Sequence, residues 1–175
     1  MMRSAGALKE RPEIQEYAAL ATENGLPGEV LSMIDEVRAQ GSIPANDARF
    51  NEIYATQKAR TAGDKAALDA DAAKGAALPT ARRARGTADA LMGYGDYAKA
   101  AALYQVALDK GDPEADLVRL RLGVAQHRAG NHDAAKATLA TVGGTRKRLA
   151  TLWTTHIKQK QAPAAPAAPA PTTGR

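Results

Sequence analysis

The side chains able to carry out chemistry are few in this sequence, and they do not gather into a catalytic pattern. Two of the three histidines, His127 and His132, flank a predicted turn, and no carboxylate is placed beside them as a third metal ligand. Asp69 and Asp71 lie two residues apart on a predicted helix, so they do not share a face as a paired acid and base would. No serine lies in a nucleophile-like setting, and the chain has no cysteine. We therefore expect no enzyme activity, no metal site and no cofactor.

A turn followed by a helix occurs twice in the sequence, in residues 95–108 and 130–142. Each segment begins with a glycine, and the two glycines are 35 residues apart. Glycine suits the end of a first helix because it accepts a positive φ. Each segment then places an alanine five residues on, where two helices can approach closely, and a large residue four positions later on the same face. Self-similarity at this period predicts stacked helical hairpins.

These residues resemble the tetratricopeptide repeat, in which a Leu-Gly pair on a first helix faces a small and a large residue on a second. The later unit departs from the family pattern at Arg119 and Gln126, where tryptophan and tyrosine are usual. The resemblance covers roughly residues 80–145. The residues that carry it are Gly95, Ala100, Tyr104, Ala107, Leu122, Gly123, Gly130, Ala135 and Leu139.

The predicted architecture is an all-α, right-handed solenoid of helical hairpins with a C-terminal capping helix. We expect hairpins over about 13–40, 46–75, 80–110 and 114–142, and a capping helix over about 145–160. In the second hairpin, Gly63 is the predicted turn between helices at 46–61 and 64–75. The capping helix is expected to turn Leu149, Trp153 and Ile157 inward. Residues 1–12 form a predicted flexible segment, and the Ala/Pro-rich residues 161–175 a predicted disordered tail.

The charge is unevenly distributed, with a net −3 over residues 1–75 and +8 over residues 76–175. The resemblance implies a concave groove lined by the first helices of the hairpins. A solvated face is the simplest interpretation of the basic half, and an acidic or mixed acidic–apolar peptide is the partner we expect if the groove binds one. The basic residues do not alternate with aromatic ones, so we do not expect nucleic acid. The predicted partner-binding residues are Arg85, Asp89, Met92, Leu120, Arg121, Val124, His127 and Arg128.

The leading hypothesis for the function is a non-catalytic scaffold that binds a peptide segment of another protein. The alternative is the C-terminal repeat domain of a larger exported or envelope-assembly protein, in which the repeats mediate self-association; binding of nucleic acid through the basic half is the third. No stretch is apolar enough for a membrane span or an export signal. We expect a cytoplasmic location, or a periplasmic one if the sequence is a C-terminal fragment. The partner, the pathway and the oligomeric state do not follow from the sequence.

Overall fold

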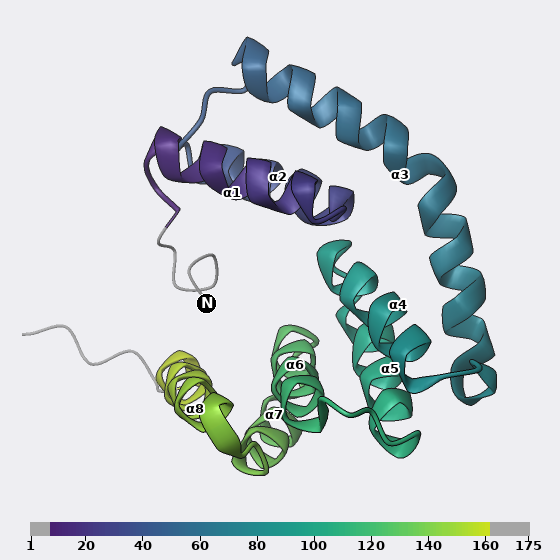
Figure 1. Ribbon diagram of the computed structural model, residues 1–175. Helices are drawn as coiled ribbons and strands as arrows, with labels where there is room; N and C mark the ends of the chain where they lie inside the picture. The colour runs from purple at the N-terminus through teal and green to yellow at the C-terminus, as the bar shows by residue number, and fades with distance from the viewer. Residues whose placement is uncertain (1–7, 162–175) are drawn as a thin grey trace, which may run out of the picture.

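The computed structural model describes residues 8–161, which form an arch of helices with no β-strand in that part of the chain (Figure 1). The predicted tail at 161–175 lies outside the described residues apart from Gln161, and so do residues 1–7 of the predicted flexible segment. Residues 8–12, which belong to the predicted flexible segment, are part of the folded structure, because Leu8 is buried and the first helix already begins at Arg11. The helices, in order, are α1 (Arg11–Glu23), α2 (Pro27–Ala39), α3 (Ala48–Lys74), η2 (Gly75–Ala77), α4 (Ala81–Gly93), α5 (Tyr97–Asp109), α6 (Ala115–Arg128), α7 (His132–Ala140), η3 (Gly144–Arg146) and α8 (Lys147–Gln161).

Three helical hairpins form where the sequence predicts them: α1/α2, α4/α5 and α6/α7. Their turns contain Gly25, Gly95 and Gly130, with φ angles of 67°, 79° and 87°. These angles lie in the left-handed region that favours glycine, so each glycine ends the first helix and lets the chain reverse. The signature side chains inside these hairpins are buried, as predicted: Ala100, Tyr104, Ala107, Leu122, Ala135 and Leu139.

The predicted second hairpin is wrong, because residues 48–74 form one continuous helix, α3. Gly63 lies inside this helix and is not among the residues with positive φ. A single glycine in a helix costs only about 1 kcal/mol relative to alanine. Both ends of α3 are anchored, since Phe50 belongs to the core around α1 and α2 while Leu68 packs against the core around α4 and α5. The exposed middle of α3 therefore bridges two cores, as the long curved helix in Figure 1 shows.

The buried residues divide into three clusters along the arch. One joins α1, α2 and the start of α3; the next joins α4, α5 and one face of α6; the last joins the rest of α6 with α7 and α8. Because α6 contributes to two clusters, adjacent hairpins share a core, as expected for stacked repeats. In α8 the inward residues are Ala150, Trp153 and Ile157. Leu149, predicted to face inward, is exposed because the buried stripe of α8 is formed by Ala150, Trp153 and Ile157, and Leu149 lies about 70° around the helix from the centre of that stripe.

Candidate functional site

The predicted groove residues Arg85, Asp89 and Arg121 are engaged with other parts of the chain. The Arg85 guanidinium donates to Asp112, at 3.1 Å, and to Glu114, both in the turn between α5 and α6. The Arg121 guanidinium donates to both carboxylate oxygens of Asp89, at 2.6 and 2.8 Å. These two contacts join α4 to the hairpin that follows it, so they hold neighbouring repeats in register.

Asp89 accepts a third hydrogen bond, from the hydroxyl of Tyr104 at 2.6 Å. Burial, and then the nearby Asp89 carboxylate, raises the pKa of Tyr104 well above its ordinary value. One carboxylate thus connects α4, α5 and α6. An acidic peptide would have to compete with Asp89 for Arg121 and with Asp112 and Glu114 for Arg85, which weakens the case for the predicted acidic-peptide site.

The apolar residues predicted to contact a partner between these arginines are largely covered. Leu120 is only 6% exposed and lies in the cluster that contains Trp153, so its prediction as a binding residue is wrong. Val124 packs against the same cluster. The physical reason is that α8 and α7 cover this side of α6, a placement that the spacing of residues along α6 does not reveal. Of the remaining predicted residues, Met92 packs against the α4/α5 core, and the Arg128 guanidinium lies 5.9 Å from the ring centre of Tyr97.

His127 lies in a cluster of rings at the end of the arch. Its Nδ1 is 2.9 Å from Nδ1 of His132, so one of the two rings donates a proton and the other accepts it. The rings of Trp153 and His156 lie 6.0 and 5.8 Å away. Burial, and then the neighbouring His132, lowers the pKa of His127. Within the described residues no three His, Asp, Glu or Cys side chains are arranged to hold a metal ion.

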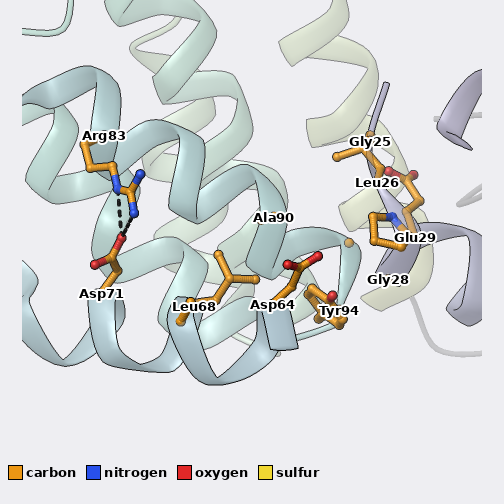
Figure 2. A pocket seen from close by; sticks show the side chains of 13 residues that line it. Gly25, Leu26, Gly28, Glu29, Asp64, Leu68, Asp71, Arg83, Ala90 and Tyr94 are labelled. Atoms are coloured by element: carbon orange, nitrogen blue, oxygen red, sulfur yellow. Dashed lines mark hydrogen bonds and ion pairs between the residues drawn. The ribbon is translucent and has the colours of Figure 1, made fainter. Parts of the chain in front are cut away.

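A pocket of about 190 Å³ lies beneath the C-terminal half of α3, and we call it the α3 pocket (Figure 2). Its walls come from the α1–α2 turn, the start of α2, the C-terminal half of α3, and α4 with the residue that follows it. The lining residues are Gly25, Leu26, Pro27, Gly28, Glu29, Asp64, Ala67, Leu68, Asp71, Arg83, Ala90, Gly93 and Tyr94. The sequence does not reveal this pocket, because its walls are brought together by contacts of α2, α3 and α4 that lie far apart along the chain.

The width of the α3 pocket is set by a close approach of α2 and α4. A Cβ on Gly28 would lie 2.7 Å from the Tyr94 ring, and one on Gly93 would lie 3.2 Å from the Glu29 backbone nitrogen. The Ser32 hydroxyl also donates to the Gly93 carbonyl at 3.3 Å. Two glycines facing each other across a helix contact are the one signal in the sequence that points to this neighbourhood.

The polar groups of the α3 pocket are unequally satisfied. At one end Asp71 accepts from the Nε of Arg83 at 2.8 Å and from Lys74 at 2.9 Å, and these bonds lower the pKa of Asp71. In the middle, the Tyr94 hydroxyl is buried and has no hydrogen-bond partner among the described residues. Burial, and then the nearby Asp64 carboxylate, raises the pKa of Tyr94. Figure 2 shows Asp64 and Tyr94 between the Asp71–Arg83 pair and the α1–α2 turn.

The tetratricopeptide repeat family model matches residues 91–148, which span the end of α4, all of α5, α6 and α7, and the start of α8. No curated protein and no solved structure gives a significant match. None of the helices in the described part of the chain is both long and apolar enough to cross a membrane. The family match identifies residues 91–148 as tetratricopeptide repeats, which in general serve as scaffolds for protein–protein interaction and are generally non-catalytic.

Proposed function

We propose that this scaffold binds a segment of a partner protein in the α3 pocket. The observation that carries the proposal is a largely apolar pocket whose wall includes Tyr94, a residue with a buried hydroxyl that has no hydrogen-bond partner among the described residues. A buried donor without an acceptor is costly, and a ligand that supplies the acceptor removes the cost. At about 190 Å³ the pocket is smaller than most small-molecule sites, which run from roughly 300 to 1,000 Å³. It suits one or two side chains of a bound peptide.

The lining indicates the chemistry of the bound segment. Leu26, Pro27, Leu68 and Ala90 provide apolar walls for an aliphatic or aromatic anchor. Tyr94 would donate to a backbone carbonyl of the segment. Asp64 forms no ion pair with any described residue, so it favours a lysine or arginine beside the anchor. The segment we propose is therefore apolar with a flanking basic residue. It differs from the acidic segment predicted for the groove lined by the first helices of two neighbouring hairpins, α4 and α6, which we call the α4/α6 groove.

The test is selection of peptides from a random displayed library, followed by titration of the selected peptides against matched variants. Ala67→Phe would fill the pocket from α3, because Ala67 lines it. Ala66→Phe is the control, since Ala66 is the adjacent exposed residue and does not line the pocket. Burying one large apolar side chain contributes about 1.5–3 kcal/mol, so blocking the pocket should weaken binding by roughly 10- to 100-fold.

Selected peptides should carry an apolar residue next to a basic one, and they should bind the Ala66→Phe variant like wild type. Equal affinity for wild type and Ala67→Phe would place the site elsewhere. A tight peptide that is acidic, and that loses affinity with Arg121→Gln, would instead support the α4/α6 groove.

A further inference from the structure

The large apolar side chains exposed in the described part of the chain lie at its two ends. They are Leu20 on α1, at 53% exposure, and Leu149 and Leu152 on α8, at 37% and 50%. A solenoid buries its apolar faces by stacking, and a terminal helix lacks one neighbour. Scattered exposed leucines need no explanation, but here they coincide with the two surfaces where a stack would continue.

The outer stripe of α1 is acidic. Glu13, Glu16, Leu20 and Glu23 follow one another at spacings of three and four residues, which places them on one helix face. All four are exposed. Glu16 and Glu23 form no ion pair with any residue between 8 and 161, so their charges are available to a partner.

The outer stripe of α8 is basic. Arg148, Leu152, Thr155 and Lys158 are exposed at the same kind of spacing, with Leu149 beside them. The sequence of α8 contains four basic residues and no acidic one. Arg148 and Lys158 form no ion pair with any described residue, which leaves this charge uncompensated locally.

The two stripes match in length as well as in charge. Glu13 to Glu23 and Arg148 to Lys158 each span ten residues, or about 15 Å along a helix. If the helices lie antiparallel, Glu23 faces Arg148 and Glu13 faces Lys158, and Leu20 and Leu152 meet between them. Within one molecule α1 and α8 lie at the two ends of the arch and do not pack on each other (Figure 1).

We infer that the chain self-associates head to tail, with α1 of one copy docked on α8 of a second copy. The occupant of each exposed stripe is then the complementary stripe of the same sequence. The contact uses two different surfaces, so it leads to a closed ring, a reciprocal dimer or an open filament. One helix on another buries less than a standard stable interface, so the association should be weak, in the micromolar-to-millimolar range, and should weaken with salt.

The experiment uses sedimentation equilibrium of the full chain at low salt, with two charge-reversal variants. Glu16→Lys/Glu23→Lys makes both ends basic, and Arg148→Glu/Lys158→Glu makes both ends acidic. Each variant alone should associate at least roughly tenfold more weakly than wild type, because like charges meet at the contact. An equal mixture of the two should associate again, since a basic end then meets an acidic end at both kinds of contact.

The control is Lys58→Glu/Arg60→Glu, which makes the same change of charge as Arg148→Glu/Lys158→Glu but on the exposed middle of α3. It should associate like wild type, and circular dichroism should show that all variants keep their helix content. A wild-type chain that stays monomeric at every concentration, or a mixture that associates no better than its components, overturns the inference. Binding of α8 to phosphatidylserine vesicles without any self-association would assign its basic face to a lipid surface and also overturn it. None of these results depends on the α3 pocket.

Discussion

Gly123→Ala should destabilise the protein although it replaces the poorest ordinary helix former with the best. Gly123 lies on α6 against α7, and an added Cβ would be 2.6 Å from Cγ of Leu139 and 2.8 Å from its Cδ2. Leu139 is buried among Ala135, Val142 and the α8 residues, so it has little room to move away. Overpacking of this kind costs about 1–3 kcal/mol, and the gain in helix propensity offsets about 1 kcal/mol of it.

Gly86→Ala is the matched control. Gly86 is exposed in the interior of α4, and an added Cβ there meets nothing within 4 Å. The propensity gain is the same as at Gly123, so it cancels in the comparison. Gly86→Ala should stabilise the protein by about 1 kcal/mol. The two variants should therefore differ by about 1–3 kcal/mol, which is the packing cost alone.

The assay is urea unfolding of wild type and both variants, followed by far-ultraviolet circular dichroism and by fluorescence of the sole tryptophan. Repeat proteins do not always unfold in one step, so the two signals should be compared before free energies are derived. Trp153 reports on the α6–α8 end, where Gly123 lies. A transition midpoint for Gly123→Ala that equals or exceeds that of Gly86→Ala would refute the α6–α7 packing described here.

Three further predictions follow from burial and charge. Ala135→Leu should lower the free energy of unfolding by about 1–3 kcal/mol while Ala98→Leu, on the exposed side of α5, leaves it nearly unchanged in the same urea assay. Emission from the buried Trp153 should be blue-shifted in the native protein and should move to the red in urea; a native spectrum like that of free indole would contradict the packing of α8. Burial lowers the pKa values of His127 and His156 below 6.5, so the unfolded chain binds more protons and stability should fall as the pH drops below about 6.5. Replacing both histidines with asparagine should make the urea midpoint nearly independent of pH between about pH 7 and pH 5. If the midpoint of this variant still falls with pH as steeply as that of wild type, the two histidines are not the cause.

The hairpins α4/α5 and α6/α7 were predictable from the sequence because their signals are local. A positive-φ glycine, a small residue and a large residue on one helix face specify a turn and the contact that follows it, whatever lies further away. The same local signals gave a wrong prediction at Gly63, where a turn was expected and the helix continues. A glycine in a polar, alanine-rich stretch fits either a turn or a helix interior, and the energy that decides between them comes from packing at Phe50 and Leu68, far along the chain.

The candidate sites show the same difference between features set by local sequence and features set by contacts between distant segments. The sequence by itself determined the all-α repeat architecture, the basic and acidic halves, and the absence of a catalytic pattern. Only the tertiary structure decided that Asp89 is shared by Tyr104 and Arg121, that Leu120 lies under α7 and α8, and that α3 passes over a pocket beside Tyr94. Pairing and burial between hairpins depend on how far one repeat is rotated against the next, and that rotation results from the sum of many side-chain contacts rather than from any one spacing along the chain.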